Sequence, residues 1–250
     1  AFSDVIRIEI TEDFTAGKST KGTDKYSSSE LDAAITAMKD ATGYAAANTL
    51  EENRANAVKQ LTATASTAKS TADVSAKAVD DNRKLIDDIV ATVEKADAAS
   101  IADKGESLFA AGKTSADLKE ALINAVNAYT TVVDGGGNAS VANIKATLTS
   151  VLGGTGNTAY GTAANMTSTF AQTKTATGGT NTAQTATGTT DAATTAGKYV
   201  DALDVIALEM GKTASANNAN QTALDTVQRN LDILSDKDLV EAKTQYDTAN

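Results

Sequence analysis

Hydrophobic residues recur at helical spacing from about residue 27 onwards. Ser27 and Glu30 have the spacing of a capping box, in which a serine and a glutamate satisfy free N–H groups at the start of a helix. From there to about Ala99, the pattern predicts one or two long, alanine-rich helices. Small and aliphatic residues repeat every seven positions in this stretch, at Ala72, Val79, Ile86 and Val93.

A second heptad repeat lies between Lys198 and Asn250. Its positions seven apart are Leu203, Met210, Asn217, Leu224 and Leu231, with Gln221 among the interleaved positions. Side chains at this spacing form a narrow seam that packs against another helix. The two seams therefore predict long helices that pack on each other or on helices of another chain. We expect Ser235, with Asp238, to cap a final short helix.

Two amides interrupt the second seam, Asn217 and Gln221. One interpretation places both side chains at the surface. The other makes them a buried polar layer that fixes the register of a helical bundle. Both interpretations stay open at this point, and all ten seam residues named above are candidates for packing between subunits.

Two shorter amphipathic helices are predicted between the seams. Thr114 and Asp117 begin the first, and glycines at 135–137 end it. The second covers roughly residues 141–152 and stops at Gly153. A long helical rod cannot bury its own apolar stripe, so we expect the rest of the chain, or another chain, to cover it.

Two stretches are predicted to form β structure. Ile6, Ile8 and Ile10 alternate with charged residues, which indicates a half-buried strand. In the Thr- and Gly-rich region, alternating runs at 173–177 and 180–189 flank two glycines, which favours a hairpin that this strand could join. Neither run has a strong apolar face, so a disordered polar linker is the alternative.

The expected fold class is mainly α, an elongated bundle of long helices with a small β element made of the N-terminal strand and the Thr-rich hairpin. Three regions follow: the strand and a helical rod at 1–154, a variable hairpin or linker at 155–197, and C-terminal rod helices at 198–250. Residues 1–10 carry charges where a signal peptide needs an apolar run, so we expect no signal peptide there.

The amino-acid composition limits the chemical reactions and binding sites that the chain can provide. The 250 residues include no Cys, His, Pro or Trp. Disulfides and thiolate metal sites are thereby excluded, and the commonest catalytic bases are missing. Adjacent carboxylates, such as Asp87 and Asp88, point in different directions on a helix and indicate a solvated face. We therefore expect no catalytic residues, cofactor or metal, and an enzyme is the least expected class.

The net charge of −10 argues against nucleic acid and anionic membranes as partners. No run has the length and apolarity of a membrane span, so membrane insertion is not expected. The expected partners are copies of the same chain, as a homo-oligomer, or neighbouring structural subunits.

The acidic composition, rich in Ala, Thr, Asn, Ser and Gly, resembles that of bacterial flagellins and flagellar hook-associated proteins, as does the order of long helices around a Thr/Gly-rich middle. Leu224, Arg229, Asn230 and Leu231, followed by residues 234–242, are similar to the end of that family's C-terminal rod helix. The resemblance implies a non-enzymatic structural subunit of an extracellular filament or appendage that acts by helical self-assembly. The alternatives are a structural protein of a phage virion or tail, and an extracellular binding module that uses the Thr-rich region.

Overall fold

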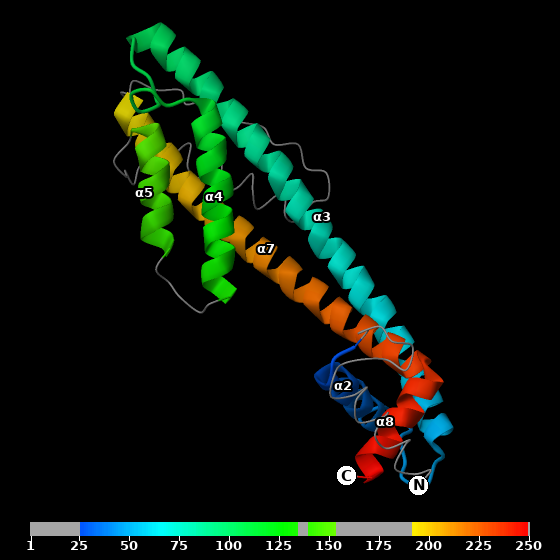
Figure 1. Ribbon diagram of the computed structural model, residues 1–250. Coiled ribbons are helices and arrows are strands. Elements are labelled where there is room, and N and C mark those ends of the chain that lie inside the picture. Colours follow the sequence, from blue (N-terminus) through cyan, green and yellow to red (C-terminus); the bar gives the residue numbers. More distant parts are fainter. Residues whose placement is uncertain (1–25, 135–139, 154–191, 250) are drawn as a thin grey trace. The chain divides into compact units, whose positions relative to one another are not determined.

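The computed structural model describes residues 26–134, 140–153 and 192–249, with side chains except at 131–134, 140–142 and 192–194 (Figure 1). Regular secondary structure in these residues is entirely helical, which confirms the mainly α class. The helices are α2 (Ser28–Lys39), α3 (Leu50–Lys104), α4 (Ser115–Asp134), α5 (Ser140–Leu152), α7 (Ala192–Ser235) and α8 (Lys237–Ala249). The small β element is not seen among the described residues, because the stretches predicted as strand and hairpin lie outside them.

The long helical stretch that begins at residue 28 is divided into α2 and α3, one of the two outcomes that the pattern allowed. The predicted capping box begins α2: Ser27 N donates to Glu30 Oε2 at 2.6 Å, and Glu30 N donates to Ser27 Oγ at 3.3 Å. A second capping box begins α3, where Thr49 N donates to Glu52 Oε2 at 2.8 Å and Glu52 N donates to Thr49 Oγ1 at 3.2 Å. In each helix the box therefore satisfies two of the free N–H groups at the start, that of the cap residue and that of the glutamate.

The cap predicted for the last helix was wrong by one residue. Ser235 is the last residue of α7, and its hydroxyl donates to the carbonyl of Leu231 at 2.7 Å. Asp236 caps α8 instead, because its Oδ1 accepts a hydrogen bond from Leu239 N at 3.2 Å. The serine hydroxyl is held inside the preceding helix, which leaves the neighbouring aspartate as the cap.

The chain forms two compact units, and α3 and α7 contribute residues to both. Of the described residues, unit 1 comprises 26–72 and 220–249, and unit 2 comprises those from Asp73 to Ala219. Each unit has a hydrophobic core of its own. The predicted middle region falls largely outside the described residues, so the division of the chain at residues 154 and 197 stays a prediction.

In unit 1, α2 and α8 pack with the beginning of α3 and the end of α7. The guanidinium of Arg54 on α3 donates to the carbonyl of Leu234 on α7 at 2.9 Å. On α8, the buried Lys243 pairs with Asp32 of α2 at 2.6 Å. The core of this unit contains Tyr26, Leu31, Ala34, Ile35, Met38, Ala41, Ala57, Ile233, Leu234, Leu239 and Val240.

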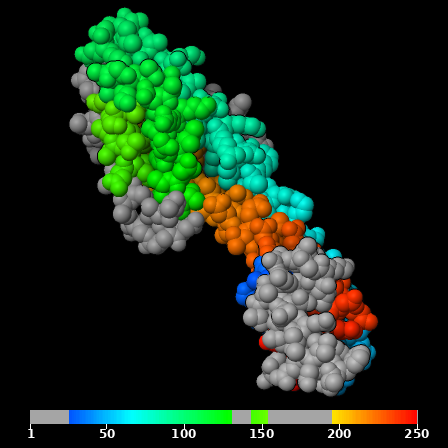
Figure 2. All heavy atoms as spheres, viewed as in Figure 1, coloured from blue at the N-terminus to red at the C-terminus, as the bar shows by residue number. Residues whose placement is uncertain are grey.

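Unit 2 is a four-helix bundle of α3, α4, α5 and α7, in which each helix runs opposite to the one before it (Figure 1). The space-filling view shows α4 and α5 side by side at the surface (Figure 2). Polar contacts join neighbouring helices: Asp87 with Lys119 (α3 to α4), Lys145 with Asp201 (α5 to α7) and Ser75 with Asn217 (α3 to α7).

The shorter helices of unit 2 begin and end close to the predicted positions. Thr114 N donates to Asp117 Oδ2 at 2.8 Å, which caps α4 as expected. After α5, Gly153 adopts a φ of 63°, a backbone conformation that glycine takes without strain. The turn after α3 is fastened to the end of α5 by a hydrogen bond from Ala110 N to the carbonyl of Val151 at 2.7 Å.

Candidate binding groove

The ten predicted seam residues fall into two groups by burial. The buried ones are Ala72, Ile86, Val93, Leu203, Met210 and Leu224. The half-buried ones are Val79, Asn217, Gln221 and Leu231. Four of the buried residues, Ile86, Val93, Leu203 and Met210, belong to the core of unit 2 and therefore pack against helices of the same chain. A role of these ten residues in contacts with another subunit stays a prediction.

Asn217 makes a polar contact between helices. Its Oδ1 accepts a hydrogen bond from Ser75 Oγ at 3.0 Å, which joins α7 to the antiparallel α3 in unit 2. A contact of this kind fixes the register of two helices, because a shift along the axis would separate the two side chains. Gln221, half a heptad further along α7, is half-buried.

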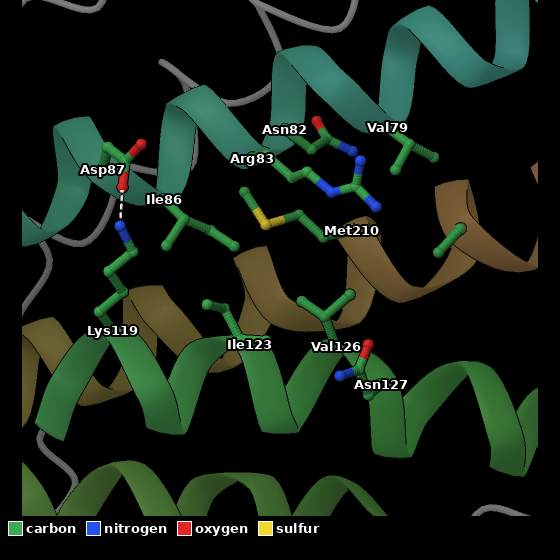
Figure 3. A pocket seen from close by; sticks show the side chains of 11 residues that line it. Val79, Asn82, Arg83, Ile86, Asp87, Lys119, Ile123, Val126, Asn127 and Met210 are labelled. Carbon is green, nitrogen blue, oxygen red and sulfur yellow. Dashed lines mark hydrogen bonds and ion pairs between the residues drawn. The ribbon is translucent and has the colours of Figure 1, made fainter. Parts of the chain in front are cut away.

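A groove of about 340 Å³ lies between α3 and α4, with α7 as its floor (Figure 3). The lining residues of each wall recur after three or four positions, in places as adjacent pairs, so each helix turns one face toward the groove. The α3 wall consists of Val79, Asn82, Arg83, Ile86 and Asp87, and the α4 wall of Lys119, Ile123, Val126 and Asn127. Met210 and Ala214 of α7 complete the lining. The volume lies within the range of about 300–1,000 Å³ that is usual for binding sites.

The interior of the groove is apolar. Met210 and Ile86 are almost fully buried beneath it, with 2 % and 5 % of their surface exposed. Ile123 on the α4 wall is 39 % exposed, so part of its apolar surface lines the open groove. An apolar side chain that entered the groove would remove this isoleucine from water, and burial of apolar surface is favourable.

Charged side chains border the apolar interior. Lys119 Nζ pairs with Asp87 Oδ1 at 2.5 Å across the two walls. Arg83 Nη1 pairs with Asp80 Oδ1 at 2.8 Å, and the Arg83 side chain is 73 % exposed. A guanidinium carries five N–H donors, so Arg83 can hold a second carboxylate while it keeps Asp80.

Sequence reasoning found only part of this groove. The seam predicted from the sequence includes Val79, Ile86 and Met210. Asp87 lies on a face that is predicted to be solvated, and Ile123 is not among the predicted residues. A signal was present in the sequence, because Ile123 lies one position off the apolar stripe of Leu118, Leu122 and Val126 in the same helix. A large aliphatic residue beside the core stripe indicates apolar surface that its own bundle does not cover.

A second group of polar atoms is buried on α7. Among the described residues, Tyr199 OH and Asp204 Oδ1 are buried without a hydrogen-bond partner. Burial raises the pKa of Tyr199 to about 12. Burial also raises the pKa of Asp204, with a further contribution from Asp201, while the Lys145 ammonium opposes the shift. Five positions separate Tyr199 and Asp204, which places them on different faces of α7, so they form no acid–base pair.

The described part of the chain contains no cluster of three or more acidic side chains that could hold a metal ion. Of the helices that the structure describes, none is long and apolar enough to cross a membrane. Comparison of the chain with protein-family models, with curated proteins and with solved structures finds no match.

Proposed function

We propose that this chain is a non-enzymatic structural subunit of an extracellular filament or appendage and acts by helical self-assembly. The observation that carries the proposal is that each of the two long helices contains a long stretch with few buried residues. Between residues 58 and 84 of α3, the buried residues are Ala72 and Asn82. Between residues 212 and 232 of α7, they are Ser215 and Leu224.

A helix with so few buried residues is stabilised either by polar pairs on its surface or by a partner that covers it. The seam residues of the two helices favour coverage by a partner. Val79 of α3 and Gln221 and Leu231 of α7 lie at heptad positions and are only half-buried. Helices with 3.5-residue repeats pack through such positions against other helices. The lengths of the two helices, 55 residues for α3 and 44 for α7, also exceed the average of about 10–14 residues in globular proteins.

The resemblance to flagellins and hook-associated proteins supports the extracellular placement. The similar stretch begins at Leu224 in the last part of α7 and ends at Ala242 in α8. A subunit of this kind acts through surfaces that match neighbouring subunits, so its function depends on helix faces rather than on a reactive group.

Sedimentation velocity over a wide range of protein concentrations tests the proposal. The wild-type chain should shift from monomer to larger species as its concentration rises. Gln221→Lys places a charge on the half-buried seam position and should weaken self-association at least tenfold. The matched control is Gln228→Lys, at an exposed position of the same helix, which should behave as wild type. A wild-type chain that stays monomeric at every concentration would contradict the proposal.

A further inference from the structure

The side chain of Asn82 is a buried amide in the α3 wall of the groove. Only 7 % of this residue is exposed, and it lies among the lining residues that Figure 3 shows. Among the described residues, its side chain has no hydrogen-bond partner. A buried amide without a partner costs free energy, because it has given up most of its contact with water. A molecule in the groove that supplied the missing hydrogen bonds would therefore gain affinity at this residue.

The charged side chains of the lining already have partners in the same chain. Lys119 pairs with Asp87 across the two walls, and Arg83 pairs with Asp80 on its own helix. A charged ligand would compete with these pairs and would lose its own hydration in an apolar groove. The pairs therefore favour an uncharged occupant. Because the Arg83 guanidinium has further N–H donors, a carboxylate is the competing occupant.

The chemistry of Asn82 defines the polar part of the ligand. An asparagine side chain offers a carbonyl oxygen that accepts hydrogen bonds and an NH₂ group that donates them. A ligand satisfies both when it carries a donor and an acceptor side by side. A carboxamide has this arrangement, so two amides can pair through two parallel hydrogen bonds.

The interior of the groove defines the apolar part of the ligand. Met210 and Ile86 lie beneath the groove, and Ile123 exposes part of its surface to it. The groove has a volume of about 340 Å³. Since a water molecule takes up about 30 Å³ in the liquid, the groove has room for on the order of ten non-hydrogen atoms. An aliphatic group of several carbons would fit beside an amide, and its burial would favour binding.

We propose that the groove binds a small, uncharged ligand in which a carboxamide adjoins an aliphatic group. The N–H of the ligand donates to Asn82 Oδ1, and its carbonyl oxygen accepts from Asn82 Nδ2. The aliphatic group lies against Met210, Ile86 and Ile123. No covalent bond forms or breaks, so the groove is a binding site and not a catalytic one. The inference goes beyond the proposed function of self-assembly and does not depend on it.

Nuclear magnetic resonance of the isotope-labelled, full-length protein tests the inference, with isocaproamide as the probe. The side-chain N–H signals of Asn82, identified by their absence from an Asn82→Leu variant, should shift saturably as the probe is added. The dissociation constant should be about 1 mM or lower. Two related molecules serve as comparisons: acetamide lacks the aliphatic group, and isocaproate has a carboxylate in place of the amide at nearly the same shape. Both should bind at least tenfold more weakly than isocaproamide.

Variants of the groove test the roles of its two parts. Asn82→Leu replaces an unpartnered amide by an apolar side chain of similar size, so it should fold as wild type in thermal unfolding and bind the probe at least tenfold more weakly. Ile123→Ala should weaken binding several-fold, because less apolar surface is buried. The matched controls are Asn143→Leu and Ile101→Ala, at exposed positions outside the groove, and both should bind as wild type.

Three results would each overturn the inference. One is the absence of saturable shifts at roughly ten times the expected dissociation constant, where such a site would be about nine-tenths filled. Another is tighter binding of isocaproate than of isocaproamide, which would mean that Arg83 selects a carboxylate. The third is unchanged binding by the folded Asn82→Leu variant. None of these results bears on sedimentation of the chain without ligand, so self-assembly is tested separately.

Discussion

Tyr129 on α4 lies directly against Gly211 on α7: a Cβ built on the glycine would be 2.1 Å from Tyr129 Cδ1. The two helices therefore meet in unit 2 with no side chain between the tyrosine ring and the glycine backbone. Thr130, the next residue of α4, has its hydroxyl 3.5 Å from the carbonyl oxygen of Gly211. Glycine is the residue that permits this close approach, because any Cβ would overlap the ring.

The first prediction concerns this contact. Gly→Ala inside a helix normally stabilises by up to about 1 kcal/mol. Gly211→Ala should instead lower the free energy of unfolding by roughly 1–3 kcal/mol, since the ring has to move. Urea denaturation of the single variant and of Gly211→Ala combined with Tyr129→Ala measures the coupling. Independent effects of the two substitutions would contradict the close contact.

The second prediction concerns the buried hydroxyl of Tyr199. The pKa of this group is about 12 in the folded chain and about 10 in an unfolded one, so the unfolded state loses its proton first. Stability should therefore fall by roughly 2–3 kcal/mol as pH rises from about 10 to about 12. Tyr199→Phe should lack this part of the decline, whereas Tyr44→Phe, at an exposed tyrosine, should keep it. Parallel alkaline unfolding curves for both variants would argue against the shift.

The third prediction concerns Asp204. Burial is the main cause that raises the pKa of the Asp204 carboxyl group in the folded state. The folded chain therefore binds the proton of this group more tightly than the unfolded chain does. Stability accordingly decreases as pH rises through the interval between the two pKa values. Asp204→Asn does not titrate, so it should be more stable than wild type near pH 7. The gain should disappear in acid, and Asp225→Asn, at an exposed site of the same helix, should show neither effect.

The fourth prediction concerns the loop between α2 and α3. The side chain of the buried Asn53 donates to the carbonyl of Ala45 at 3.0 Å and accepts from its N–H at 3.1 Å. Asn53→Ala would leave both backbone groups without this partner and should cost roughly 2 kcal/mol. Asn56→Ala, which removes one exposed hydrogen bond to Gly43, should cost less. Hydrogen exchange at the Ala45 amide should accelerate in the first variant and hardly change in the second.

Local signals in the sequence predicted the helices well. The capping box at Ser27, the glycine after α5 and the heptad repeats depend on neighbours within one or two helical turns, which a single sequence displays. Ser235 shows the limit of such signals, because the neighbouring Ser235 and Asp236 are both residue types that suit an N-cap. The serine does not act as the cap, because its hydroxyl donates to the backbone carbonyl of Leu231.

The groove and the glycine contact could not be predicted in the same way. Whether Ile123 is a core residue or an exposed one depends on how far α3 stands from α4, and that distance is set by packing along the whole bundle. Gly211 looks like an ordinary weak position in a helix until Tyr129, more than 80 residues earlier, is placed against it. Sequence patterns specify which faces are apolar, but not which part of a face its own chain leaves uncovered.

Electron microscopy of the concentrated wild-type protein in negative stain shows whether the chain assembles. Filaments or other ordered assemblies with a regular repeat are expected, because contacts between different helix faces of neighbouring copies continue from copy to copy unless they close a ring. The Gln221→Lys variant should give far fewer such assemblies under the same conditions, and Gln228→Lys should give them as wild type does. Fields of single, unassociated particles at the highest concentration of the wild type would contradict the account.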